Sequence, residues 1–290
     1  MKVSVIIPSR SERFLSQTVA DVLRNARGDV EVLVVLDGYW CDPPLAEDPR
    51  LHVIHRGAAA GMRPGINAAA ALARGDYLLK LDAHCMVSEG FDVELAKAGE
   101  PDWVVIPRRK RLDAEAWAIQ DVGKPDVDYE YLSWPDNPAD FGGPGLNGRP
   151  WTERILARRD VEIDENLSFQ GSGWFMPRAY FSRLELMDTD SYGPFWNEAQ
   201  EIGFKAWLSG GRVMTNKRAW YAHLRKSKKH GRGYTMQSSW LNQGASYTKR
   251  WMLNKAWSKQ TIPFDWLIDR FWPIPGWPVD WRQQIARLVA

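Results

Sequence analysis

The sequence predicts an α/β fold with a mostly parallel, doubly wound central sheet, and three observations support this prediction. Short apolar runs alternate with helical segments over about the first eighty residues. Several of these runs end in polar or charged residues, as strands do where their carboxyl ends form a ligand-binding edge. The chain has 290 residues, of which 44% are hydrophobic and 26% charged, so it can bury the core of one large domain.

Each predicted element has its own signature. Strands are predicted where β-branched or leucine-rich runs stop at a proline, a glycine or a charged residue, at Val3–Ile7, Glu31–Leu36, Leu51–His55, Tyr77–Leu81 and Trp103–Pro107. Helical spacing, alanine content or an acidic first turn predicts helices at Ser11–Arg24, Met62–Ala73 and Asn197–Leu208. No G-x-G-x-x-G motif follows the first strand, so the fingerprint of a dinucleotide site is absent, yet Asp37 at a strand end is placed to bind a nucleoside.

The middle of the chain, residues 108–150, is predicted to be irregular. Asp126–Tyr131 is acidic and aromatic, and Gly142-Gly143-Pro144-Gly145 is predicted to be a loop. One interpretation is a surface connection. A connection of this length inside a compact domain is more often functional.

The composition limits the classes of protein. Two cysteines, Cys41 and Cys85, are too few for a disulfide framework, so we expect a reducing compartment. The apolar run at the N-terminus is too short for the core of a signal peptide. No segment approaches the roughly 20 apolar residues of a membrane helix. We therefore expect a cytoplasmic protein without a membrane partner.

The net charge of +2 hides an asymmetry along the chain. Residues 202–264 contain no Asp or Glu and thirteen Lys or Arg, so the remainder carries a net charge of about −11 (2 − 13). Tryptophan and tyrosine are interleaved with these cations. The segregation predicts an anionic ligand or surface as a partner.

The motif Asp82-Ala83-His84 directly follows the leucine-rich strand at 77–81. If the strand continued, Asp82 and His84 would point to the same face. A carboxylate beside an imidazole suits a divalent metal such as manganese better than it suits calcium. The alternative is an acidic turn whose histidine has no role in metal binding.

Three later segments are candidates for the rest of a site. Gly171 and Gly173 predict either close approach of the backbone to a ligand or a β-bulge. Glu198 and Glu201 share one helix face, although acids at a positive helix end are also common. The segment 223–234 is predicted to close over a phosphate-bearing ligand or to be a solvated basic loop.

Several short blocks occur in the same order as in a known family of enzymes. They are Ser4-Val5-Ile6-Ile7 with Ser11-Glu12 and Thr18-Val19, Gly61-Met62-Arg63, Gly75-Asp76, Leu81-Asp82-Ala83-His84-Cys85, Gly171-Ser172-Gly173-Trp174-Phe175 with Tyr180-Phe181, Glu198–Trp207 with Gly210-Gly211, and His223, Arg225-Lys226 and His230. Over residues 3–234 the chain resembles GT-A glycosyltransferases, and it is most similar to the polypeptide N-acetylgalactosaminyltransferases. The family's double glycine before its first catalytic glutamate is replaced here by Phe195-Trp196-Asn197.

The resemblance implies an enzyme that uses a UDP-sugar and Mn²⁺ or Mg²⁺. The metal ligands would be Asp82, His84 and His223. The donor would be held by residues from the strand ends and the loops beside them, namely Pro8, Arg10, Glu12, Asp37, Arg63, Asp82, Gly173 and His230. Asp37 and Arg10 would bind the uridine, and Arg63 would reach the sugar and diphosphate. The catalytic residues would be Glu198, Glu201, Arg225 and Lys226.

The same resemblance implies a domain division. Residues 1–234 would form the GT-A catalytic domain, with a nucleotide-binding half at 1–107 and a sugar and acceptor half at 108–234. Residues 235–290 would form a basic, aromatic extension packed on this domain, in which the prolines of Trp272–Pro278 exclude a continuous helix.

The acceptor is left open between two macromolecules. The basic, aromatic span favours a hydroxymethylated pyrimidine in DNA, as in DNA modification in a virus-infected bacterial cell. The resemblance favours Ser or Thr of a polypeptide, with GalNAc or a related hexose as the sugar. A third hypothesis is a non-catalytic protein that binds a nucleotide-sugar or a polyanion. Front-face attack with retention of the anomer is expected, and the alternative is inversion with Glu198 or Glu201 as the general base.

Overall fold

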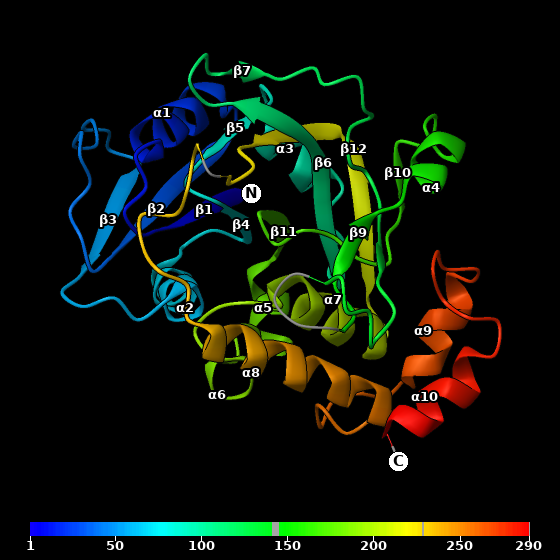
Figure 1. Cartoon of the computed structure of the whole chain (residues 1–290). Helices are drawn as coiled ribbons and strands as arrows, with labels where there is room; N and C mark the ends of the chain where they lie inside the picture. The colour runs from blue at the N-terminus through cyan, green and yellow to red at the C-terminus, as the bar shows by residue number, and fades with distance from the viewer. Residues whose placement is uncertain (141–144, 228, 290) are drawn as a thin grey trace.

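A computed structural model describes residues 1–140, 145–227 and 229–289 (Figure 1). The N-terminal half alternates strands and helices, as predicted. The elements are β1 (Lys2–Ser9), α1 (Leu15–Asn25), β2 (Asp29–Asp37), β3 (Leu51–Arg56), α2 (Met62–Leu72), β4 (Tyr77–Leu81), β5 (Cys85–Val87), α3 (Phe91–Lys97) and β6 (Trp103–Asp113).

The second half adds short strands and most of the helices. Its elements are β7 (Ala118–Ile119), β8 (Glu130–Leu132), β9 (Gly148–Pro150), α4 (Thr152–Ala157), β10 (Ile163–Glu165), β11 (Gly173–Pro177), α5 (Arg178–Arg183), α6 (Thr189–Tyr192), α7 (Glu198–Leu208), β12 (Arg212–His223), α8 (Ser238–Lys249), the 3₁₀ helix η1 (Arg250–Leu253), α9 (Phe264–Arg270) and α10 (Trp281–Val289).

The central sheet has the strand order β10-β12-β6-β11-β4-β1-β2-β3. Strands β4, β1, β2 and β3 are parallel, and β12 is parallel to β6, whereas β11 runs antiparallel to both β4 and β6. The predicted α/β class with a mostly parallel sheet is therefore confirmed. The antiparallel β11 makes the sheet mixed.

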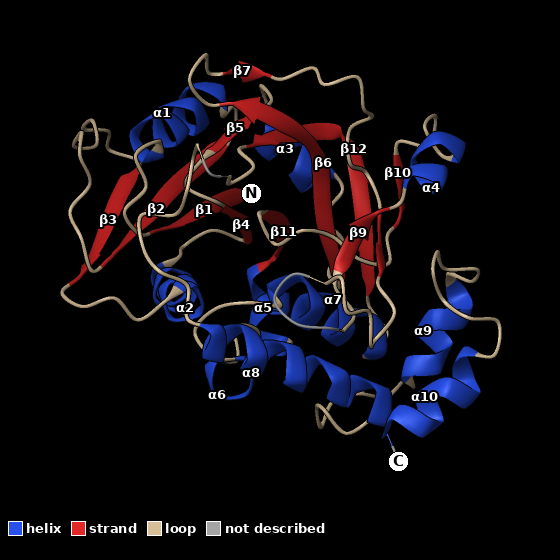
Figure 2. Ribbon diagram, in the orientation of Figure 1, coloured by secondary structure: helices blue, strands red, loops and turns tan. Residues whose placement is uncertain are grey.

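Helices cover both faces of the sheet (Figure 2). Alternate residues of β1 point to opposite faces, so Val5 joins the core against α1 while Ile6 joins the core against α2. The second core continues through α7 into the C-terminal helices, where Trp251, Trp277 and Trp281 are buried. The tail thus shares one hydrophobic core with the sheet, and the domain boundary near residue 234 stays a prediction.

Two expectations about local structure need correction. Residues 108–113 are not irregular, because β6 continues to Asp113 beside β12. Strand β4 ends at Leu81, so Asp82 and His84 lie in the turn before β5 rather than on one strand face. Of the predicted loop at 142–145, Gly142, Gly143 and Pro144 lie outside the described residues. None of the helices in the described ranges is long and apolar enough to cross a membrane.

Candidate functional site

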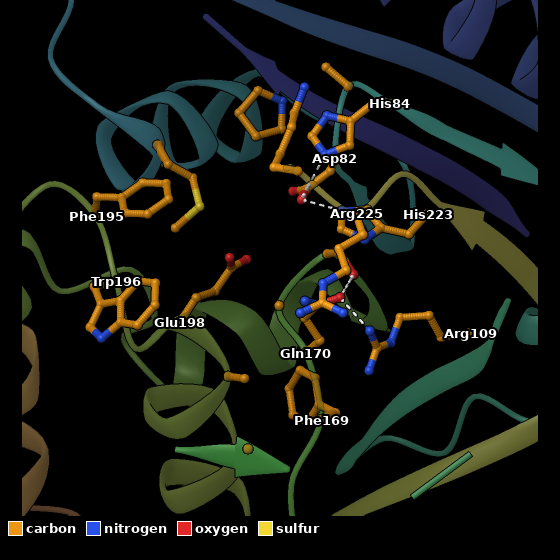
Figure 3. A pocket seen from close by; sticks show the side chains of 18 of the residues that line it. Asp82, His84, Arg109, Phe169, Gln170, Phe195, Trp196, Glu198, His223 and Arg225 are labelled. Carbon is orange, nitrogen blue, oxygen red and sulfur yellow. Dashed lines mark hydrogen bonds and ion pairs between the residues drawn. The ribbon is translucent and has the colours of Figure 1, made fainter. Parts of the chain in front are cut away.

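A cavity of about 880 Å³ opens at the carboxyl ends of β1, β2 and β4, and Figure 3 shows it from close by. Its size is in the upper part of the range of roughly 300–1,000 Å³ found for small-molecule sites. Its lining combines strand-end residues with the loops around residues 120–127, 169–172, 195–200 and 223–234. A cavity therefore lies at the sheet edge where the sequence predicts a ligand-binding site.

Three predicted metal ligands meet in this cavity. Ligand atoms of Asp82, His84 and His223 all lie within 4.8 Å of one another. His223 Nε2 is 3.2 Å and His84 Nε2 3.8 Å from Asp82 Oδ2. Two donor atoms bound to one ion at about 2.1 Å lie roughly 3–4 Å apart, so this spacing fits a single divalent ion.

The backbone explains how residues so distant in sequence meet. Strand β5 pairs with β12 so that Cys85 lies opposite His223. The turn just before β5 therefore carries His84 to the end of β12, with the two imidazole rings 4.8 Å apart. The Asp82 amide donates to Ser172 O at 2.9 Å, which anchors the other end of the turn. Sheet pairing and turn geometry, rather than strand alternation, make the cluster.

The protonation states suit a metal. Burial lowers the pKa of His223 to about 4 despite the opposing effect of Asp82, so its imidazole is neutral at neutral pH. Burial alone would raise the pKa of Asp82, but the nearby Lys80 ammonium holds it well below its usual range. A neutral imidazole and an ionised carboxylate are the forms that coordinate metal ions.

Glu12 supports the cluster from behind. Its carboxylate lies 3.0 Å from His84 Nδ1 and also pairs with Lys226. Burial alone would raise the pKa of Glu12, but His84 and Lys226 together lower it to about 2. A carboxylate at the second ring nitrogen fixes the orientation of a metal-binding histidine. The predicted donor residue Glu12 thus lines the cavity and contacts His84 and Lys226.

The residues predicted to bind the nucleoside also line the cavity. Pro8, Arg10 and Asp37 line it together. Asp37 accepts hydrogen bonds from the Ala60 amide at 2.9 Å and the Gly61 amide at 2.8 Å, which fixes its carboxylate at the end of β2. The guanidinium of Arg10 lies 4.6 Å from the centre of the Tyr234 ring. A flat cation over an aromatic ring presents planar groups on which a base can stack.

The first acid of α7 lines the cavity. Glu198 Oε1 accepts from Trp174 Nε1 at 2.6 Å, and Oε2 accepts from Lys80 Nζ at 3.2 Å. Burial raises the pKa of Glu198, and Lys80 opposes this. Arg225 and Lys226 follow β12 and line the same cavity, with Arg225 exposed.

Two predicted site residues lie elsewhere. Arg63 and Glu201 are fully buried and form an ion pair with each other. Glu201 also accepts from Lys205 Nζ at 2.8 Å, and Arg63 donates to Trp196 O at 2.8 Å. A side chain with no exposed surface has no room to touch a donor. Neither residue lines the cavity in this structure, so their contact with a donor stays a prediction.

Gly173 and His230 also differ from expectation. A Cβ on Gly173 would lie 2.9–3.1 Å from the ring of Tyr221, so this glycine makes room for a tyrosine rather than for a ligand. His230 packs edge-on against Phe14 and lies 3.8 Å from Glu115. Gly171, not Gly173, lines the cavity, where its missing side chain accommodates Glu198.

Sequence reasoning missed several cavity residues. Arg109 lines the cavity and donates to Gln170 Oε1 at 2.9 Å. Phe195 and Trp196 form an aromatic wall beside Glu198 (Figure 3). The sequence analysis also did not single out Lys80. A lysine inside a predicted core strand indicates a buried ion pair, because buried lysines are almost always paired.

Many of the cations that cluster along residues 202–264 are paired with acids in the folded structure. At least seven of the thirteen cations in residues 202–264 pair with acids, all of which lie outside that span: Lys205, Arg212, Lys217, Arg218, Lys226, Lys249 and Lys259. The span therefore forms no continuous basic face through these residues. The main sequence argument for a DNA acceptor loses its force.

Comparison with known proteins decides the family. Residues 4–180, more than half of the chain, match the family described as glycosyl transferase family 2. The chain belongs to this family. No curated protein matches its sequence. The predicted enzyme class, a glycosyltransferase, is thereby confirmed.

Solved structures agree with the fold of this family 2 glycosyltransferase. It is similar to GalNAc-T7, solved with UDP, GalNAc and Mn²⁺, at a TM-score of 0.67 and 16% identity over 93% of this chain. The match spans 56% of the GalNAc-T7 chain. It is also similar to residues 1–349 of S. aureus TarS, solved with UDP-GlcNAc, at a TM-score of 0.53 and 18% identity, covering 86% of this chain and 67% of that one. The predicted GT-A arrangement is confirmed.

Proposed function

We propose that this glycosyltransferase moves a hexosyl group from a UDP-sugar to a hydroxyl of a macromolecular acceptor, and that it requires Mn²⁺ or Mg²⁺. The observation that carries the proposal is the cluster of Asp82, His84 and His223 inside a cavity that Asp37 and Arg10 also line. GalNAc-T7 was solved with UDP and Mn²⁺ bound, and TarS with UDP-GlcNAc. Both are consistent with this donor class.

Breaking the bond between sugar and diphosphate leaves charge on the departing UDP. A divalent ion at the cluster would act as a Lewis acid toward that charge. Asp82, His84 and His223 hold the ligand positions, and Glu12 lies beside the second ring nitrogen of His84. Arg225 adds positive charge at the mouth of the cavity, and Lys226 adds it once it leaves Glu12.

The stereochemical course is proposed to be retention, as the resemblance implies. Inversion needs a general base that faces the acceptor hydroxyl. Glu201 is fully buried in its ion pair, so Glu198 is the acid of α7 that lines the cavity. NMR of the product anomer distinguishes the two courses, and an inverted product would assign the base role to Glu198.

The acceptor site is proposed to lie beside Glu198, along Phe195 and Trp196. The centres of these rings are 6.3 Å apart and their planes are inclined by 28°, and Phe169 lines the same cavity. An aromatic wall of this kind stacks on flat or ring-shaped groups, which include both a nucleobase and a sugar ring. Hydroxymethylated DNA and Ser or Thr peptides remain the two acceptor hypotheses.

The proposal is tested by a donor screen that measures release of UDP. UDP-hexoses and UDP-N-acetylhexosamines are each incubated with the protein, with Mn²⁺ or with EDTA, in the presence of hydroxymethylated DNA or peptide pools. We expect release of UDP with one donor, stimulated by one acceptor and abolished by EDTA. Metal-dependent binding of UDP without release from any donor would instead support a non-catalytic binding protein.

Replacing Glu12 by glutamine is expected to weaken Mn²⁺ binding by about 10- to 100-fold, because partners of the second ring nitrogen orient a ligating histidine. Electron paramagnetic resonance of free Mn²⁺ during titration measures this affinity. Glu89→Gln is the matched control, since Glu89 is an exposed acid paired with Arg27 away from the cavity. Unchanged affinity in Glu12→Gln would remove Glu12 from the metal site.

A further inference from the structure

Lys80 is a buried cation between two carboxylates. Its side chain is 1% exposed, and its ammonium donates to Asp82 Oδ1 at 2.7 Å, to Gly171 O at 2.6 Å and to Glu198 Oε2 at 3.2 Å. Three acceptors match the three protons of a lysine ammonium. The ammonium therefore forms ion pairs with both carboxylates.

The sheet explains why Lys80 points to this place. Leu79 and Leu81, its neighbours in β4, face the core against α1, so Lys80 faces the opposite side, toward α7. Trp174 on β11 lies directly opposite Lys80 in the register and reaches the same carboxylate of Glu198. The cross-strand pair of Lys80 and Trp174 therefore donates one hydrogen bond to each carboxylate oxygen of Glu198.

The oxygens of the two carboxylates contact different groups. Asp82 Oδ1 is taken by Lys80, which leaves Oδ2 facing His84 and His223. Glu198 has both oxygens fixed, by Lys80 and Trp174, and still lines the cavity. Because both acids bind the same ammonium, the position of Glu198 is tied to that of the metal cluster.

We infer that Lys80 is a positioning residue for glycosyl transfer, whose ammonium couples the metal-ligating Asp82 to Glu198 and holds the two carboxylates at a fixed separation. The inference rests on the proposed function. Lys80 itself has almost no surface in the cavity and touches no substrate. It acts through the two acids, as a buried, fully hydrogen-bonded cation can.

The inference makes opposite predictions for turnover and for metal binding. In Lys80→Met the two acids lose their shared cation and repel each other, so Glu198 moves from its position. We expect kcat to fall by about 100-fold, because a catalytic group displaced by about 1 Å can cost that much in rate. The KM for the donor is expected to change less. Mn²⁺ binding is expected to stay as tight or become tighter, because the ion no longer competes with an ammonium for Asp82.

The experiment measures kcat, KM and Mn²⁺ affinity for the wild type, Lys80→Met and the control Lys97→Met, a surface lysine paired with Glu94. A purely structural role would weaken Mn²⁺ binding and turnover together, and that result, or an unchanged kcat, would overturn the inference. If Lys80→Met does not fold, the double variant Lys80→Met/Glu198→Gln removes the unpaired charge. In that variant the loss of turnover should equal that of Glu198→Gln alone, because Lys80 acts through Glu198. A loss larger than that of Glu198→Gln alone would contradict the coupling.

Failure of the inference and failure of the proposed function look different. A wild-type protein that releases no UDP from any donor would refute the function. Full turnover in Lys80→Met, beside an inactive Asp82→Ala variant, would refute the positioning role alone.

Discussion

Asp82→Ala is expected to lose at least about 10³-fold in kcat/KM and all stimulation by Mn²⁺. The substitution removes the ligand that joins His84 to His223, since both imidazoles approach its Oδ2 atom. A metal acting on a leaving diphosphate supplies several kcal/mol of stabilisation, and about 4 kcal/mol corresponds to 10³ in rate. Steady-state release of UDP with and without EDTA measures the loss.

The fold should survive this substitution. When the Asp82 carboxylate is removed, the Lys80 ammonium still donates hydrogen bonds to Glu198 and to Gly171 O. We expect thermal unfolding near that of the wild type. Asp29→Ala, which removes a surface acid paired with Lys2, is the control and should be fully active. Asp82→Ala with wild-type activity in the presence of a chelator would refute the metal assignment.

The parts of the site that can be predicted from sequence are those that follow local rules. Strands end where apolar runs stop, and parallel strands bring their carboxyl ends to one edge, so Asp37 and Asp82 are predicted to lie near a ligand. His223 joins them only through the family resemblance. The sequence pattern alone carries no information that β12 pairs with β5 and brings His223 beside His84.

The predicted site residues that lie outside the cavity are placed there by long-range pairing. Arg63 and Glu201 are 138 positions apart, and each has the charge expected of a ligand-binding residue. Only the three-dimensional structure shows that they form an ion pair with each other. The acid-free span of residues 202–264 is misleading for the same reason, because its cations find acids in distant segments, as Arg212 finds Glu165. Charge counted along a chain is not charge on a surface.

The start of α7 shows a third limit. Trp196 has a φ of +88° and Asn197 a φ of +50°, in the left-handed region that favours glycine. Asparagine tolerates a left-handed backbone better than most residue types, but the sequence gives no such indication for Trp196. Such strain is found most often at functional sites, and here it directs Trp196 toward the cavity next to Glu198 (Figure 3).

Arg63→Met is expected to destabilise the protein by about 3–5 kcal/mol, because it leaves a buried carboxylate without its main partner. Glu201 has no exposed surface, and Lys205 is the ammonium that would remain beside it. Denaturant unfolding measures the free energy of unfolding. Arg159→Met is the matched control, since Arg159 is 76% exposed and pairs with Asp160, which is 90% exposed, and its loss should cost no more than about 1 kcal/mol.

The same variant separates a structural role for Arg63 from a donor contact. With Arg63 in a buried ion pair, Arg63→Met should bind UDP like the wild type at temperatures where it is folded. The double variant Arg63→Met/Glu201→Gln should regain part of the lost stability, because the unpaired charge is gone. A variant of unchanged stability that binds UDP or its sugar tenfold more weakly would instead return Arg63 to the donor site.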